Sequence, residues 1–330
     1  MPELFPTRLK FSKNRLFLSL FVLLSIVLII ATQFGEAREL FRLMYTAHWA
    51  WLLLALALQV ATYVADGAKW HISVADNGYK LKFRDLAKMS LEQLSMNQFI
   101  PSIGMAGNAI VAREMFALSI PGWIVMKAIA IDIVSLLGSY VIMTAFAMYL
   151  LFGIANLTIM AILTFFLVFM TLSTLAVWHF LHNHHKWSIL NWFKRFSFVR
   201  KTTELIAEIP KEEVTPTLLF ARATSLRFAV IILDALTLWV VMYSIDVPTS
   251  FNTAFIALVA GSIGGILSFL PGGLGGFEVA CTGILVLLGT PLEAALAGTL
   301  LLRGLVLWLP LIPGVIFMRK ELFPVEARRV

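Results

Sequence analysis

The side chains of this sequence most able to do chemistry are ionisable residues inside otherwise apolar stretches. Among them are Asp132, Asp234, Glu278 and Arg303. An ionised group at the centre of a bilayer costs at least about 2.5 to 3.5 kcal/mol, so each is a candidate functional residue. Asp132 follows Pro121 by 11 residues and Arg303 follows Pro291 by 12, at nearly equivalent depth in their segments. We therefore expect Asp132 and Arg303 to be partners.

The spacing leaves more than one role open for these residues. Asp132 and Arg303 form either a structural ion pair between two helices, or a functional pair in which Arg303 binds a phosphate and Asp132 holds it while the site is empty. Glu278 is expected either to bind a cationic head group or to couple to protons. Normal transport by a Glu278→Gln variant would rule out both of those roles. Asp66, close to Lys69, is expected at the membrane interface.

The elements that must position these residues are membrane helices. Of 330 residues, 60% are hydrophobic and 14% are charged, whereas soluble domains carry about 25% charged residues. Apolar runs of the length needed to cross a bilayer predict six spans, at about 16–34, 48–66, 125–152, 157–180, 226–246 and 293–317. We expect an all-α polytopic membrane protein, with residues 1–330 forming a single integral membrane domain.

The basic residues predict the orientation of these spans. Lysines and arginines follow the second and fourth spans and end the chain, while the loop after the first span is neutral. By the positive-inside rule both termini are cytoplasmic, in a multi-pass protein of the inner (cytoplasmic) membrane. The net charge of +7 is explained by this orientation, so no nucleic-acid partner is expected. Residues 181–215 are expected to form an amphipathic cytoplasmic connection.

Two further apolar segments, about 84–118 and 252–289, are interrupted by proline and glycine. Phe99 and Pro101 match Phe269 and Pro271 at a spacing of 170 residues. Because the predicted topology places the two segments on opposite faces, each is expected to be a re-entrant helical hairpin within an inverted repeat. Repeat one covers about 48–153 and repeat two about 218–318. Such broken segments in corresponding positions indicate the binding site of a transporter.

The hairpin residues are candidates for binding a substrate. In the first hairpin they are Pro101, Gly104, Gly107, Asn108 and Arg113, and in the second they are Pro271, Gly272, Gly273, Gly275 and Gly276. Glycines let the chain turn tightly and expose N–H groups that can hold an anion such as a lipid phosphate. The alternative is that the glycines only permit close packing of helices.

The two hairpin motifs, FIPSIGMAGNAIVAREM and PGGLGGFE, resemble those of the lysylphosphatidylglycerol synthase transmembrane family, the flippase-like domain of the multiple peptide resistance factor. The resemblance covers about residues 12 to 320. In the family the first motif is usually richer in glycine, with a pair where this chain has Met105-Ala106-Gly107. In full-length relatives aminoacyl transfer belongs to a soluble domain after the membrane region. Only about a dozen residues follow the last span here, so we expect no transferase activity.

Catalytic and metal-binding alternatives have little support in the sequence. No HExxH or GxSxG motif occurs, and the single cysteine, Cys281, excludes an intramolecular disulfide. The histidines between 179 and 185 lack an accompanying carboxylate or thiol, so we expect an interfacial cluster, no metal and no cofactor. The expected function is alternating-access transport of a phospholipid, an aminoacyl-phospholipid or a polyprenyl-phosphate-linked sugar. A lipid-modifying enzyme or glycosyltransferase is a possible partner. The alternatives are an assembly partner in cell-envelope synthesis or an intramembrane lipid-modifying enzyme.

Overall fold

The computed structural model describes residues 42, 45–99, 104–152, 157–183 and 217–322, and the regular secondary structure in these ranges is helical. Five helices there are long and apolar enough to cross a membrane, namely Trp49–Ala75, Gly122–Leu151, Leu157–Leu181, Thr217–Ser244 and Leu292–Gly314. The predicted all-α polytopic membrane fold is thus confirmed, and these helices correspond to the second through sixth predicted spans. The predicted span at 16–34, and all but the first three residues of the connection at 181–215, lie outside the described residues.

The first half of the chain consists of α3 (Trp49–Ala75), α4 (Phe83–Phe99), α5 (Met105–Ala117) and α6 (Gly122–Leu151). The helix α7 (Leu157–Asn183) follows, and the second half consists of α10 (Thr217–Ser244), α11 (Phe251–Leu267), the short helix η3 (Pro271–Gly273), α12 (Gly276–Leu287), α13 (Leu292–Arg303), the π-helical turn η4 (Gly304–Trp308) and α14 (Leu309–Leu322). The breaks between α4 and α5 and between α11 and α12 fall where proline and glycine predict them.

The helices of the first half recur in the second half at a spacing of about 170 residues. Helices α3 and α10 have 27 and 28 residues, α4 and α11 both have 17, and α5 and α12 have 13 and 12. The turns recur as well. Ile120 N donates to Met115 O (3.1 Å) after α5, and Thr290 N donates to Leu285 O (2.9 Å) after α12. In both copies a proline follows and begins the next helix, where the missing N–H costs no hydrogen bond.

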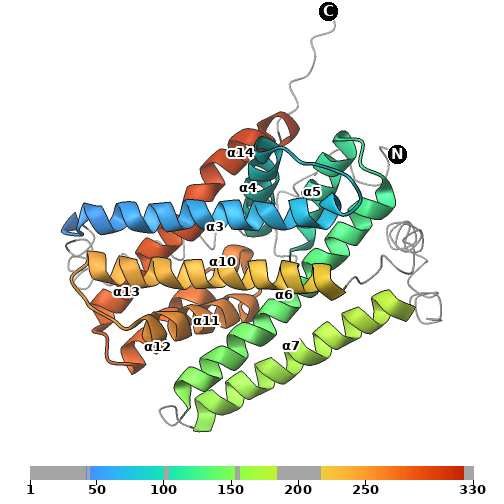
Figure 1. Ribbon diagram of the computed structural model, residues 1–330. Helices are drawn as coiled ribbons and strands as arrows, with labels where there is room; N and C mark the ends of the chain where they lie inside the picture. Colours follow the sequence, from blue (N-terminus) through green and yellow to red (C-terminus); the bar gives the residue numbers. More distant parts are fainter. Residues whose placement is uncertain (1–41, 43–44, 100–103, 153–156, 184–216, 323–330) are drawn as a thin grey trace, which may run out of the picture.

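The first helices of the two halves, α3 and α10, lie side by side and run antiparallel (Figure 1). The N-terminal end of α3 meets the C-terminal end of α10, where His48 N donates to Ser244 O at 2.7 Å. Each hairpin packs against the long helix of the opposite half, α4 on α14 and α11 on α6. The two halves are therefore arranged in opposite directions around the α3–α10 contact.

Glycines allow the helices of each hairpin to approach closely. A Cβ on Gly276 would overlap the carbonyl oxygen of Gly264, and one on Gly273 would lie 2.9 Å from the Cα of Gly265. In the first hairpin a Cβ on Gly107 would lie 2.7 Å from the carbonyl oxygen of Gln93. These three positions need glycine for packing, so the packing interpretation applies to part of each motif.

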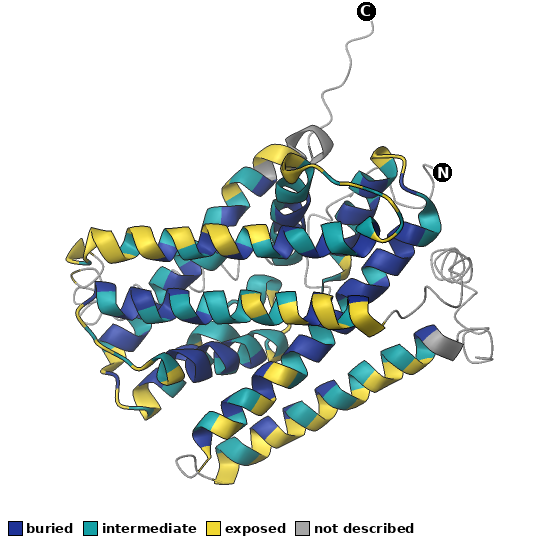
Figure 2. Cartoon of the chain, in the orientation of Figure 1, coloured by how far each residue is buried: buried dark blue, intermediate teal, exposed yellow. Residues whose placement is uncertain are grey.

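Apolar side chains cover the outer faces of the helix assembly. The outer face of α7 is exposed along its length (Figure 2), and the face carries Phe165, Phe169 and Leu172. Helix α3 exposes Leu53 and Val60 in the same way. In a membrane such faces contact lipid chains. The polar side chains described next lie instead between the helices.

Candidate functional site

The Arg303 site joins the second hairpin to the end of α13, and we define it as Gly272, Gly275, Glu278 and Arg303. Arg303 is 7% exposed. Its Nε donates to Oε1 of Glu278 at 2.7 Å, and its Nη2 donates to the carbonyl oxygen of Gly272 at 2.6 Å. The guanidinium also lies over the ring of Phe277, 4.7 Å from the centroid. Arg303 therefore holds the hairpin tip through three kinds of contact.

The PGGLGGFE sequence builds this geometry locally. Pro271 begins η3, and Gly272 and Gly275 adopt φ values of 63° and 80°, a region that favours glycine. Gly275 is the N-cap of α12, and its N–H donates to Oε2 of Glu278 at 2.7 Å. One carboxylate thus bridges the N-terminus of α12 and the Arg303 guanidinium.

The Arg303 site is suited to an anion. A guanidinium forms charge-assisted, often bidentate bonds with carboxylate or phosphate. The N-terminus of a helix adds backbone donors and a favourable dipole. In the structure the guanidinium and the helix N-terminus both stabilise the Glu278 carboxylate, and the Glu278 side chain is 17% exposed. A phosphate that entered the site would compete with Glu278 for the same donors.

The tip of the second hairpin is in contact with α4 of the first hairpin. Helix η3 packs on α4, and a Cβ on Gly272 would lie about 4.0 Å from the carbonyl oxygen of Gln98 near the end of α4. The side-chain Oε1 of Gln98 is buried and has no hydrogen-bond partner. Pro101, at the first hairpin tip, lies outside the described residues. The two hairpins therefore meet where Gly272 of the Arg303 site approaches the end of α4.

In the first hairpin the predicted residues are held by amide side chains. Gly104 has a φ of 84° and begins α5, and Gly107 N donates to Oδ1 of Asn97 at 2.9 Å. Asn108 is buried and accepts from Nε2 of Gln93 at 2.7 Å. Asn108 occupies the repeat position of Glu278, so the two hairpins carry a neutral and an acidic group at equivalent places.

Arg113 lies in an ion-pair group between α4 and α5. Its Nη2 donates to Oε1 of Glu114 at 3.0 Å, and Nζ of Lys88 lies 2.5 Å from Oε2 of the same residue. The Arg113 side chain is 36% exposed. The structure thus places Arg113 beside Glu114 rather than with the Arg303 site.

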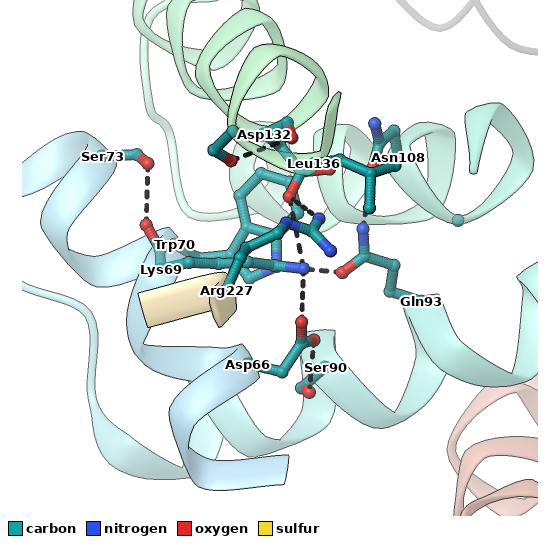
Figure 3. Close-up of polar contacts among 12 residues, drawn as sticks. Asp66, Lys69, Trp70, Ser73, Ser90, Gln93, Asn108, Asp132, Leu136 and Arg227 are labelled. Atoms are coloured by element: carbon teal, nitrogen blue, oxygen red, sulfur yellow. Dashed lines mark hydrogen bonds and ion pairs between the residues drawn. The ribbon is translucent and has the colours of Figure 1, made fainter. Parts of the chain in front are cut away.

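A second polar site, which we call the charge cluster, consists of Asp66, Lys69, Asp132, Arg227 and Ser90 from four helices. Nζ of Lys69 lies 2.7 Å from Oδ1 of Asp66 and 3.2 Å from Oδ1 of Asp132, so the ammonium group bridges the two acids (Figure 3). Arg227 Nη2 also pairs with Asp132, and Ser90 donates to Oδ2 of Asp66 at 2.9 Å. Two acids and two bases leave the cluster formally neutral.

One prediction is wrong at the charge cluster. Asp132 does not pair with Arg303, because its partners are Lys69 and Arg227. Equal depth gives the position of a residue along its helix but not the direction in which its side chain points. The 170-residue spacing relates Asp132 to Leu302, which is one residue, or about 100° of helix rotation, from Arg303. Asp66, which is expected at the membrane interface, is 6% exposed and pairs with Lys69.

Asp234 lies elsewhere on the α3–α10 contact. Its Oδ1 accepts from Nε2 of Gln59 at 2.8 Å, and the same nitrogen donates to Oγ1 of Thr237 at 3.1 Å. Gln59 is fully buried, and its Oε1 has no hydrogen-bond partner. Asp234 and Arg227 are seven residues apart on α10, so this amide–acid group lies about two helical turns from the charge cluster.

A π-helical turn, η4, begins directly after Arg303. The Tyr63 hydroxyl on α3 donates to the carbonyl oxygen of Leu305 in this turn at 2.6 Å. In the first half the equivalent helix, α6, continues without such a turn. The helix that carries Arg303 is therefore linked to α3 at the point where its winding changes.

Sequence reasoning missed Arg227, Lys69 and Gln59 as site residues. Arg227 lies at the start of a predicted span, where the cost of an intramembrane charge would have marked it as a candidate. Lys69 fitted the positive-inside pattern and was assigned to a loop, although α3 continues to Ala75. Gln59 is an uncharged polar residue in an apolar stretch, and this indicates a site residue less strongly than a charge does.

Comparison with known proteins gives one family and one relative. The family described as the lysylphosphatidylglycerol synthase TM region matches residues 16–314. A UPF0104 membrane protein of Methanothermobacter thermautotrophicus is 36% identical over 88 residues. This alignment covers 26% of this chain and 26% of that protein, so the chain matches about a quarter of the length of the relative.

Proposed function

This chain belongs to the lysylphosphatidylglycerol synthase transmembrane family, and on that premise we propose that it is a flippase for a phosphate-containing amphipathic lipid. The substrate class is a phospholipid, an aminoacyl-phospholipid or a polyprenyl-phosphate-linked sugar. The membrane is the cytoplasmic membrane, with both termini on the cytoplasmic side. A lipid-modifying enzyme or a glycosyltransferase would supply or consume the lipid.

The observation that supports this function best is the buried guanidinium of Arg303 at the tip of the second hairpin. A cation in a membrane-spanning segment is costly unless a counter-charge accompanies it. Glu278 supplies that counter-charge at 2.7 Å in the structure. A lipid phosphate would supply it during transport and would take over the N–H of Gly275 as well. Glu278 then acts as the internal anion that fills the site between substrates.

The arrangement of the halves suits alternating access. We propose that they form an inverted repeat with two re-entrant hairpins, supported by the antiparallel α3–α10 pair and by the contact between η3 and α4. In such carriers one repeat moves against the other around a fixed site. The head group would cross at the hairpin tips while the acyl or prenyl chains stay in the bilayer.

We propose transport rather than catalysis because the Arg303 site offers donors and no free nucleophile. Both carboxylate oxygens of Glu278 accept hydrogen bonds, one from Arg303 and one from Gly275. The donors of the Arg303 site can bind a phosphate and release it, and movement of a head group requires both steps.

The test is a flip assay in proteoliposomes with fluorescent phospholipid and polyprenyl-phosphate probes. Arg303→Gln is expected to reduce flipping to the level of protein-free liposomes, because the cation that binds the phosphate is lost. Arg303→Lys is expected to retain part of the rate, since a point charge lacks the fork geometry of guanidinium. Glu278→Gln is expected to slow flipping, because a neutral amide competes poorly with the bound phosphate and release becomes limiting.

The matched control is Arg222→Gln, which removes an exposed arginine from α10 and is expected to flip at the wild-type rate. Normal flipping by Arg303→Gln or by Glu278→Gln would contradict the assigned roles. If folded wild-type protein moves neither probe, the assembly-partner function replaces transport. Release of a modified lipid from the probes would instead favour the enzyme function.

A further inference from the structure

Asp234 differs from three other acids of the membrane-spanning helices and the second hairpin, namely Asp66, Asp132 and Glu278. Asp66 and Asp132 pair with Lys69, and Glu278 pairs with Arg303. Asp234 makes no ion pair with any described residue, and it accepts a hydrogen bond from the neutral amide of Gln59. An unpaired carboxylate at membrane depth is costly, and taking up a proton removes that cost.

The partner of Asp234 can serve either protonation state. In the structure the amide nitrogen of Gln59 donates to the carboxylate, while the amide oxygen is buried and without a partner. Rotation of the amide by half a turn would present that oxygen to a protonated Asp234, which then donates. Buried polar groups normally find partners, so the unused oxygen is an independent sign that the second state is accessible.

Helices α3, α6, α11 and α13 pack on α10, and all of these except α11 carry ionisable side chains. Helix α3 contributes Tyr63, Asp66 and Lys69, and α6 contributes Lys127, Asp132 and Tyr140. On α10 itself Arg227 is held by Asp132. Helix α11 has no ionisable side chain, and on α13 the ionisable groups are Glu293 and Arg303, the latter held by Glu278. Asp66, Lys69, Asp132, Arg227 and Arg303 thus each have a counter-charge, whereas Asp234 makes no ion pair with a described residue.

We propose that Asp234 is a proton-binding site in the α3–α10 contact and that the proton it carries drives lipid movement. The carboxylate takes one proton from water on one side of the membrane, becomes neutral, and returns the proton to water on the other side. The coupling part of this inference rests on the proposed function, whereas the proton-binding part does not.

Proton binding is tested on purified protein by infrared difference spectroscopy, without any lipid substrate. Between mildly basic and mildly acidic pH, the wild type is expected to gain the C=O stretching band of a buried protonated carboxyl group. Asp234→Asn should lack this band and Asp234→Glu should restore it at a shifted frequency. Gln59→Leu should retain the band at a different frequency, since the amide partner is gone. The control, Asp246→Asn, removes an exposed acid next to α10 and should leave the band unchanged.

The same band in wild type and folded Asp234→Asn would overturn the proposal. Asp234→Asn resembles the protonated acid in shape and charge, so it is expected to fold. If it does not, Gln59→Leu decides, because a band of unchanged frequency in that variant would show that the titrating group is not Asp234.

Coupling is tested in proteoliposomes with an imposed pH gradient. With one proton per lipid, a gradient of one pH unit should drive about a tenfold unequal distribution of the probe between leaflets. Asp234→Asn should give an even distribution while still exchanging probe. Accumulation driven by a sodium gradient, or accumulation by Asp234→Asn, would overturn the coupling. Failure of every probe to cross would refute the flippase function, and the infrared result would still decide proton binding.

Discussion

At the scale of single residues, the acids of the membrane helices are distinguished by their partners rather than by their depth. Asp132 forms ion pairs with two cations and Glu278 forms one with a single cation, whereas Asp234 accepts a hydrogen bond from an amide. The sequence identified Asp132, Asp234, Glu278 and Arg303 because an isolated charge in an apolar run is conspicuous. It could not identify the pairs, because side-chain direction depends on how the helices rotate against one another.

Asp132→Asn tests the charge cluster. The variant leaves Arg227 without its partner and Lys69 with Asp66 alone, and removing one member of a buried ion pair costs about 3 to 5 kcal/mol. We expect thermal unfolding in detergent at a clearly lower temperature than wild type. Asp246→Asn, which removes an exposed acid beside His48, should change stability very little.

The double variant Asp132→Asn with Arg227→Gln completes this test. It removes a charge of each sign, so it should lose less stability than the sum of the two single variants. Equal stability of Asp132→Asn and wild type would show that the cluster does not hold α3, α6 and α10 together.

At the scale of elements, the two hairpins show what proline and glycine spacing can predict. The breaks fall close to Pro101 and Pro271, as predicted, because a helix rarely continues through such residues. The separate reasons for each glycine were not predictable. Gly272 and Gly275 need a positive φ, whereas Gly276 needs room for a neighbouring backbone. The first reason is local, and the second depends on which helix packs opposite.

Gly276→Ala tests the close approach of α11 and α12. The added Cβ would overlap the carbonyl oxygen of Gly264, which is backbone and cannot move alone. Overpacking of this kind costs about 1 to 3 kcal/mol, so the melting temperature should fall and flipping should decrease. Gly283→Ala, on the same helix with nothing within 4 Å of the added Cβ, should be as stable as wild type or slightly more stable. The same melting temperature for both variants would contradict this packing.

At the scale of the whole molecule, the 170-residue spacing between Pro101 and Pro271 predicted that the helices of the first half recur in the second half. The opposite direction of α3 and α10 agrees with the opposite orientation that the positive-inside rule assigns to them. The pseudo-symmetry of the packing, in which each hairpin lies on the long helix of the other half, was not predictable. A repeat in sequence relates the halves to each other but does not say which surfaces they share.

Ala117→Cys and Leu287→Cys test the opposed hairpins. The two positions are 170 residues apart. Each residue is exposed and is the last residue of the second helix of its hairpin, Ala117 in α5 and Leu287 in α12. In a background without Cys281, a membrane-impermeant maleimide should label Leu287→Cys from the outside and Ala117→Cys only from the cytoplasmic side. Labelling of both from one side would refute the inverted repeat.

The antiparallel contact of α3 with α10 has a consequence for how this protein arose. A contact with this approximate two-fold relation is isologous, so two copies of one half-length chain, inserted in opposite orientations, would pair through the same surface. In an ancestor of that kind, equivalent positions of the two copies would carry the same side chain. In the present chain Lys69 corresponds to Trp239, Arg227 to Ala57 and Asp234 to Val64. Duplication and fusion of such a gene would free each copy to diverge, and the α3–α10 surface would then acquire Lys69, Arg227 and the unpaired acid Asp234, each on one side only.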